Sequence, residues 1–87
     1  MAIIWIPGLL QGMTGGKDRV SVPGATLREA IEALDGLYPG IKVRLVDGDR
    51  LRPSIAVAVD GQVSRQRLRH RLEPESEIVF LPPISGG

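Results

Sequence analysis

The sequence predicts an α+β domain in which a mixed sheet of four to five strands carries one main helix packed on one face. Short runs with strand character lie at both ends, at 2–6 and 75–81, and others lie between them. Only 26–38 repeats its apolar residues at three- and four-residue steps, as an amphipathic helix does. With 87 residues the chain can bury one modest core, and one helix across one sheet is the compact solution.

The first strand is predicted at 2–6, an apolar run that we expect to be buried on both faces and to end at Pro7-Gly8. A loop is expected over 9–17, where glycines lie close together. Residues 18–22 alternate between polar and apolar side chains, which is the period of a half-buried strand. The two strands are predicted to pair as an antiparallel hairpin.

The helix is predicted to begin at Thr26, because Thr26 and Glu29 have the spacing of a capping box. Its charged residues, Asp35 among them, are expected to face water, and Pro39-Gly40 is expected to end it. The apolar stripe predicted to pack on the core comprises Leu27, Ala30, Ile31, Leu34, Leu37 and Tyr38.

The second half of the chain is predicted to supply the remaining strands. Segment 54–59 places its branched residues on one face, and Asp60-Gly61 predicts a tight turn into a short return strand. The pattern over 41–53 leaves its structure open. Residues 75–81 are predicted to form a central strand, since the second half of this run is apolar at every position.

Pro82-Pro83 cannot continue a ladder in the middle of a sheet. We therefore expect the domain to comprise residues 1–83 and residues 84–87 to form a flexible tail that ends in two glycines. A glycine pair has no β-carbon to collide with the walls of a narrow channel.

Composition argues against several classes of function. A net charge of +1 gives no overall bias toward nucleic acid or an anionic membrane, and no aromatic residue is interleaved with the arginines of 64–72. The absence of cysteine excludes disulfides, thiolate metal sites and a nucleophilic thiol. No apolar run approaches the roughly 20 residues of a membrane span, and the start lacks a secretory signal, so we expect a cytoplasmic protein.

Three local patterns favour plain structural interpretations. Residues 12–17 lack both the first glycine and the hydroxyl of a phosphate-binding loop, so a hairpin loop is expected there. The basic segment 64–72 is interpreted first as a solvated face with its two leucines turned inward, and second as a dock for an acidic partner. The glutamates at 73, 75 and 77 are expected to neutralise it. His70, the only histidine, is expected to be a surface residue with no metal or nucleophilic role.

The C-terminal residues give the most specific indication of function in the sequence. Phe80-Leu81-Pro82-Pro83 followed by a terminal Gly86-Gly87 resembles the ThiS/MoaD family of ubiquitin-like beta-grasp sulfur carriers. The resemblance covers essentially the whole chain, including Thr26-Leu27 at the helix start and the turn at Val59-Asp60-Gly61. It implies a beta-grasp fold. Loop lengths are similar to those of carriers that feed cysteine biosynthesis, while the ending suits the molybdopterin branch equally well.

The resemblance implies a carrier or protein co-substrate, or the small subunit of a synthase complex, and not an enzyme. A ubiquitin-activating-type adenylating enzyme would use ATP to activate the Gly87 carboxylate, and a sulfur donor would then leave a thiocarboxylate. A sulfur-accepting synthase of cysteine, molybdopterin or thiamine type would receive the sulfur. No bound cofactor or metal, and neither nucleic acid nor membrane, is expected. The residues expected to contact the partner are Gly86, Ser85, Ile84, Leu81 and Phe80.

Two alternatives stay open at the level of sequence. The first is a ubiquitin-like modifier, in which activated Gly87 forms an isopeptide bond with a lysine of another protein. The second is a plain interaction module whose diglycine has no chemistry.

Overall fold

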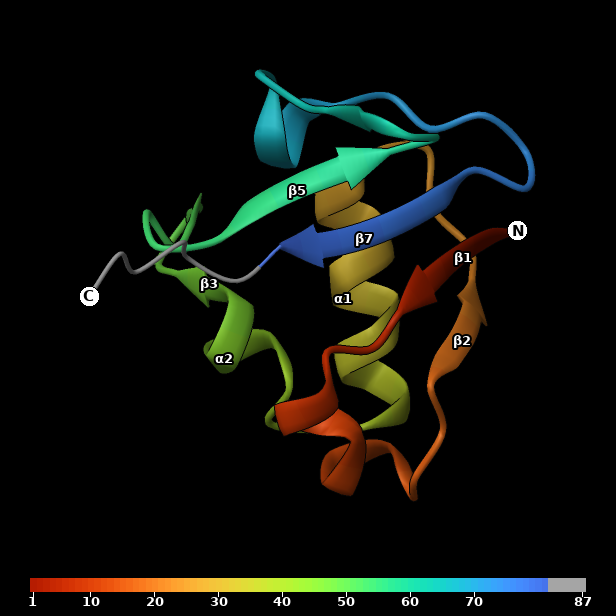
Figure 1. Cartoon of the computed structure of the whole chain (residues 1–87), viewed down its shortest axis with the longest axis vertical. Coiled ribbons are helices and arrows are strands. Elements are labelled where there is room, and N and C mark those ends of the chain that lie inside the picture. The colour runs from red at the N-terminus through yellow and green to blue at the C-terminus, as the bar shows by residue number, and fades with distance from the viewer. Residues whose placement is uncertain (82–87) are drawn as a thin grey trace.

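The computed structural model describes residues 1–81, in which a five-stranded sheet carries helix α1 against one face (Figure 1). This confirms the predicted α+β class, the mixed sheet and the single main helix. The elements in chain order are β1 (Ala2–Trp5), η1 (Gly8–Thr14), β2 (Arg19–Val22), α1 (Leu27–Leu37), α2 (Lys42–Leu45), β3 (Val46–Asp47), β4 (Arg50–Leu51), β5 (Ala56–Val59), β6 (Gln62–Val63), η2 (Arg67–Arg69) and β7 (Glu77–Leu81), where η denotes a 3₁₀ helix.

The sheet has the strand order β2-β1-β7-β5-β6. Strands β1 and β7 are parallel, with Ile4 beside Ile78, and the other pairs are antiparallel. Strand β7 therefore lies between β1 and β5, as predicted for a central strand. The hairpin predicted from the first two strands is also confirmed.

Helix α1 begins as its capping residues predict. Thr26 Oγ1 accepts a hydrogen bond from the Glu29 amide at 3.3 Å, and Glu29 Oε1 accepts one from the Ala25 amide at 2.9 Å. The buried stripe is shorter than predicted, because Leu37 is 58% exposed. At 3.6 residues per turn, Leu37 is rotated by about 80° from Leu27, which places it at the margin of the stripe.

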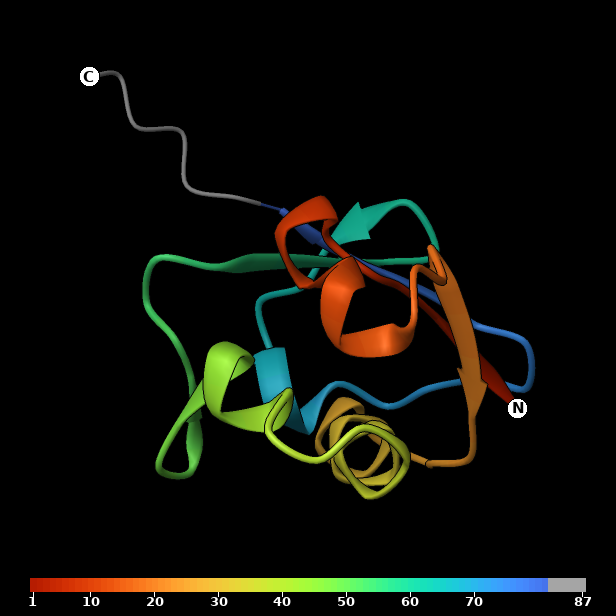
Figure 2. The ribbon, with the colours of Figure 1, turned by 90° about the horizontal axis from the view of Figure 1, so that it is seen from below.

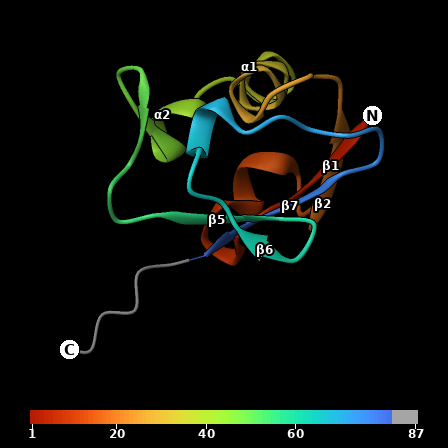
Figure 3. The ribbon, with the colours of Figure 1, turned by 90° about the horizontal axis from the view of Figure 1, so that it is seen from above.

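Within residues 1–81, helices cover one face of the sheet and leave the other open. Figures 2 and 3 show α1, α2 and η2 on the same side of it. In β1 the side chain of Ile4 is fully buried, whereas Ile3 and Trp5 are half-buried. The prediction that this strand is buried on both faces is therefore wrong. In β7, likewise, Val79 is 38% exposed although its neighbours Ile78 and Phe80 are buried.

Residues 9–17, predicted to be a loop, contain most of the 3₁₀ helix η1. Pro7 precedes the helix with φ −56°, and its carbonyl accepts a hydrogen bond from the Leu10 amide at 2.8 Å. Gly15 ends it in the left-handed conformation, at φ 66°. Thr14 is buried at its end and donates a hydrogen bond to the Lys17 carbonyl at 2.8 Å.

Residues 41–53 form α2 and a small β3–β4 hairpin. Asp35 links them to α1, since its Oδ1 accepts hydrogen bonds from the amides of Gly40 at 3.1 Å and Lys42 at 3.0 Å. Asp35 was expected to face water and is instead half-buried, with its carboxylate close to the start of α2.

Candidate docking surface around the last strand

An apolar groove lies at the end of β7, where the described part of the chain stops. Its volume is about 620 Å³. Phe80 and Leu81 line it from the sheet, and η1 and α2 provide its other sides. The remaining lining residues are Pro7, Gly8, Leu9, Leu10, Arg44, Leu45 and Ile55.

Leu9 is the most unusual residue of this groove, because its side chain is 99% exposed. It lies in the first turn of η1, which is held by the Leu10–Pro7 backbone hydrogen bond and by Gln11, whose Nε2 donates to the Ile6 carbonyl at 3.1 Å. A leucine held on the rim of an apolar groove has no stabilising role in the isolated domain. Exposed apolar surface of this kind marks contact sites for other proteins.

A row of mainly apolar side chains crosses the uncovered face of the sheet. The strand registers place Trp5 beside Val79, Val79 beside Ala58 and Ala58 beside Val63. All four side chains are at least partly exposed, and Val63 is 64% exposed. On the outer strand, Arg19 pairs with Trp5 and ends the row.

The indole of Trp5 is fixed from two sides. Its Nε1 donates a hydrogen bond to Glu77 Oε1 at 2.9 Å, and the guanidinium carbon of Arg19 lies 5.5 Å from the ring centroid, within the range of a cation–π contact. The ring is thus held in one orientation on the uncovered face. A rigid aromatic side chain loses little entropy when a partner covers it.

The structure brings together two of the residues predicted to contact a partner. Leu81 pairs with Ala56 and Phe80 with Val57, so that Phe80 points toward the core and Leu81 toward the uncovered face. Both line the groove. The other predicted positions, Ile84, Ser85, Gly86 and Gly87, lie outside the described residues, as does the predicted boundary at residue 83.

Sequence reasoning missed three of the contact candidates: Leu9, Trp5 and Val63. A signal for Leu9 was present, since a leucine directly after Pro7-Gly8 cannot follow the burial pattern of the strand before it. Trp5 and Val63 required knowledge of which sheet face α1 covers.

No side-chain active site is apparent within residues 1–81. They contain no cluster of histidine, aspartate and glutamate that could hold a metal ion. Ser64 Oγ lies 2.7 Å from His70 Nδ1, a pair that the sequence did not predict, and His70 is half-buried rather than a surface residue. Ser64 is only 6% exposed, and none of the described carboxylates bonds to His70, so the pair lacks both access and an orienting acid.

Comparison with known proteins then places the chain. A model described as the ThiS family matches residues 4–87. The chain belongs to the ThiS family. This match confirms the resemblance found from the ending, and it extends over nearly all of the sequence, including the part that the structure leaves undescribed.

The relatives of this ThiS-family chain carry descriptions of two kinds. The sulfur carrier protein CysO of Mycobacterium tuberculosis is 31% identical over 87 aligned positions, and the alignment covers 94% of each chain. A chain in the crystal structure of the Amycolatopsis orientalis BexX/CysO complex superimposes with a TM-score of 0.92 at 31% identity and full coverage of both chains. The small archaeal modifier protein 1 of Methanosarcina acetivorans gives a TM-score of 0.80 at 25% identity, covering 99% of this chain and 95% of that one.

These solved structures share the ubiquitin-like beta-grasp fold that the resemblance implied. Within residues 1–81 no helix has the length and apolar character needed to cross a membrane.

Proposed function

We propose that this protein is a sulfur carrier, a protein co-substrate whose Gly87 carboxylate is converted to a thiocarboxylate. The observation that carries the proposal is the family match through residue 87, together with 31% identity to a protein described as a sulfur carrier.

The proposed reaction has two steps. A carboxylate oxygen of Gly87 attacks the α-phosphorus of ATP in the active site of an adenylating enzyme of the ubiquitin-activating type, and pyrophosphate leaves. A sulfide-level donor then attacks the acyl carbon, and AMP leaves with the bonding pair of the C–O bond. The product is a thiocarboxylate at Gly87. The carboxylate alone is a poor acyl donor, and the mixed anhydride supplies the activation that it lacks.

The adenylating enzyme is proposed to contact the groove at the end of β7 and the apolar row on the uncovered face. The groove adjoins Leu81, which directly precedes the undescribed residues, and Leu9 is held on its rim. Ile84, Ser85 and Gly86 are proposed to contact the same enzyme as Gly87 reaches its nucleotide. ATP is bound by that enzyme and not by the carrier.

The acceptor of the sulfur is proposed to be a biosynthetic synthase. The solved BexX/CysO complex is a precedent for a similar chain assembled with a second protein. The cysteine-type pathway is favoured over the molybdopterin and thiamine types, because the curated relatives carry the CysO name.

The test is reconstitution with the adenylating enzyme of the same organism. The full chain should support ATP–pyrophosphate exchange, and with a sulfide donor its intact mass should rise by one oxygen-for-sulfur replacement. The matched control is the chain lacking Gly86 and Gly87, which should support neither reaction. If the truncated chain supported ATP–pyrophosphate exchange and was thiolated like the full chain, the proposal would be overturned.

A second function is supported by the similarity to small archaeal modifier proteins. In that case activated Gly87 would form an isopeptide bond with a lysine of another protein. Protein isolated from its own cell distinguishes the two functions. A thiocarboxylate mass supports carriage, whereas larger species that survive denaturant and reducing agent and require Gly87 support conjugation.

A further inference from the structure

We propose that an arginine-lined hollow beside η2 binds an acidic segment of a protein partner, by a contact separate from the chemistry proposed for Gly87. The hollow has a volume of about 680 Å³ and lies among the first turn of α1, the β3–β4 hairpin with the chain that follows it, and η2. Its charged lining residues are Arg28, Arg50, Arg67, Arg69 and Asp49.

The fold collects these charges from three separate segments of the chain. Within residues 1–81 the ion pairs are Met1–Glu75 and Lys42–Glu32, so Arg28, Arg50 and Arg69 take part in none. All three side chains are exposed. Their guanidinium groups are therefore available to a partner.

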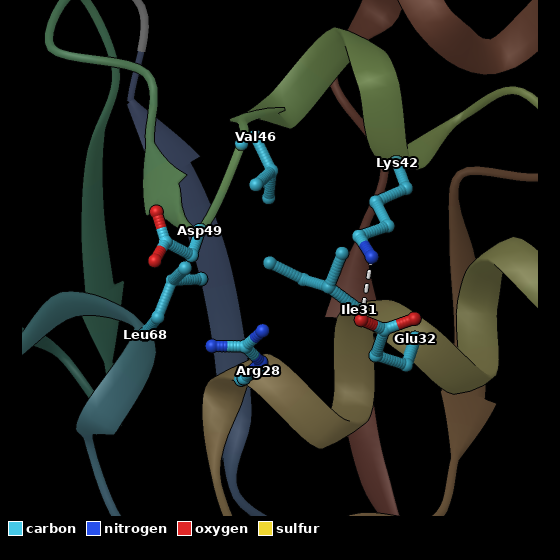
Figure 4. A pocket seen from close by; sticks show the side chains of 8 residues that line it. Arg28, Ile31, Glu32, Lys42, Val46, Asp49 and Leu68 are labelled. Atoms are coloured by element: carbon cyan, nitrogen blue, oxygen red, sulfur yellow. Dashed lines mark hydrogen bonds and ion pairs between the residues drawn. The ribbon is translucent and has the colours of Figure 1, made fainter.

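Arg28 is turned toward the hollow because of its surroundings on α1. Glu32, four residues further along the helix, would ordinarily pair with it. Instead Glu32 is bound to Lys42 of α2. Figure 4 shows the Arg28 guanidinium pointing away from that ion pair and toward Leu68.

The glutamates expected to neutralise the basic segment lie elsewhere, so that expectation is wrong. Glu77 accepts the hydrogen bond of the Trp5 indole, and Glu75 lies 3.9 Å from the N-terminal amine. Glu73 lines a different hollow, beside Pro23 and Met1. Asp49 is therefore the only acid among the described residues that line the arginine hollow.

The wall of the hollow is held in place by Arg67. This residue has φ 54°, a left-handed conformation that is costly for a side chain with a β-carbon. Its Nη2 donates to the carbonyls of Arg52 at 3.0 Å and Ile55 at 2.7 Å, and its amide donates to Ser64 Oγ at 3.0 Å. These bonds tie η2, which carries Arg69, to the segment before β5.

The lining selects for carboxylates next to apolar groups. Guanidinium groups pair with carboxylates through two parallel hydrogen bonds, and the buried Leu51 and Leu68 contribute apolar surface between the charges. No aromatic side chain lines the hollow, so nucleic-acid bases have nothing to stack on. An extended acidic segment with apolar residues among its acids fits this surface.

The position of the hollow permits two contacts at once. Its walls, α1 and η2, lie on the covered side of the sheet (Figure 3). Trp5 and Val79 alternate along their strands with the buried Ile4 and Ile78, and they therefore face the opposite side. A partner held by its acidic segment would leave the apolar row uncovered.

The test uses the ¹⁵N-labelled full chain titrated with a synthetic peptide of alternating glutamate and leucine at low ionic strength. Saturable amide shifts are expected at Arg28, 49–52 and 66–69. The triple variant R28A/R50A/R69A should bind about tenfold more weakly. The control variant K17A/R65A/R71A removes the same charge from exposed positions outside the hollow and should bind within about twofold of the parent.

Three results would overturn the proposal. One is the absence of shifts at these positions, and another is an equal loss of affinity in both triple variants, which would indicate non-specific attraction. The third is tighter binding at the same residues by inorganic phosphate or a single-stranded oligonucleotide. The chain lacking Gly86 and Gly87 should bind the peptide as the full chain does, so failure of sulfur transfer would leave this result unchanged.

Discussion

The hydroxyl of Ser64 lies 2.7 Å from Nδ1 of His70 and accepts a hydrogen bond from the Arg67 amide at 3.0 Å. The two contacts close the turn that carries η2. The His70 carbonyl in turn accepts a hydrogen bond from the Leu27 amide at 2.9 Å, so the same turn is tied to the start of α1. Ser64 thus closes the η2 turn through its hydroxyl, and the His70 carbonyl ties that turn to α1.

Replacing Ser64 by alanine is expected to lower the free energy of unfolding by about 1–3 kcal/mol, since it leaves the partly buried Arg67 amide without its acceptor. Urea denaturation measures the change. Ser54→Ala, at an exposed serine, is the matched control and should change stability by less than about 0.5 kcal/mol. Equal stability of the two variants would mean that the Ser64 contacts contribute nothing.

Gly24 and Gly36 should respond in opposite directions to alanine. A β-carbon at Gly24, whose φ is 152°, would lie 2.7 Å from the backbone nitrogen of Ala30, so Gly24→Ala should cost about 2 kcal/mol or more. Gly36 lies within α1 with open space at its β-carbon position, and Gly36→Ala should stabilise by up to about 1 kcal/mol. Thermal unfolding of both variants measures the two changes in stability. A Gly24→Ala variant as stable as the parent would contradict the prediction.

Leu9→Ser should leave the free energy of unfolding unchanged, because the side chain is 99% exposed. It should reduce kcat/KM for adenylation about tenfold or more, because the apolar contact with the enzyme is lost. ATP–pyrophosphate exchange measures the rate. Leu37→Ser, at a leucine exposed on the far end of α1, serves as the control and should keep the parent rate. Equal rates in the two variants would remove Leu9 from the contact.

Trp5 offers a direct probe of the uncovered sheet face, since it is the only tryptophan. In a chain carrying 5-fluorotryptophan, the ¹⁹F resonance should shift when the adenylating enzyme is added, because the half-buried ring would lose its remaining water. Complex formation without a change in this resonance would show that the enzyme binds elsewhere.

Local patterns predicted the elements whose determinants are local. Thr26 and Glu29 predicted the start of α1, and Asp60-Gly61 predicted the β5–β6 turn. Burial was harder to predict. Ile3 and Val79 are apolar but face outward, because one helix can cover only one face of the sheet. Both residues lie on a surface that a partner is proposed to cover. Apolar character therefore does not predict burial at these two positions.

Parts of the site depend on contacts that no sequence pattern encodes. The arginine hollow joins Arg28 to Arg50 and Arg69 by tertiary folding. These three arginines form no ion pair within residues 1–81, where Glu32 bonds to Lys42 and Glu77 to Trp5. Leu9 was missed because η1 was predicted to be a loop. Phe80 and Leu81 were proposed as partner contacts because the prolines after them indicated where the strand ends. Both line the groove, and their contact with a partner stays a prediction.

The parallel pairing of β1 with β7 has a consequence for synthesis. Trp5 and Glu77, which are joined by a side-chain hydrogen bond, are 72 residues apart in the chain. While β7 is still inside the ribosome, β1 and β5 lack the strand that separates them and present open edges to other nascent chains. The sheet can therefore close only after β7 has left the ribosome, with closure of the longest loop as a slow step.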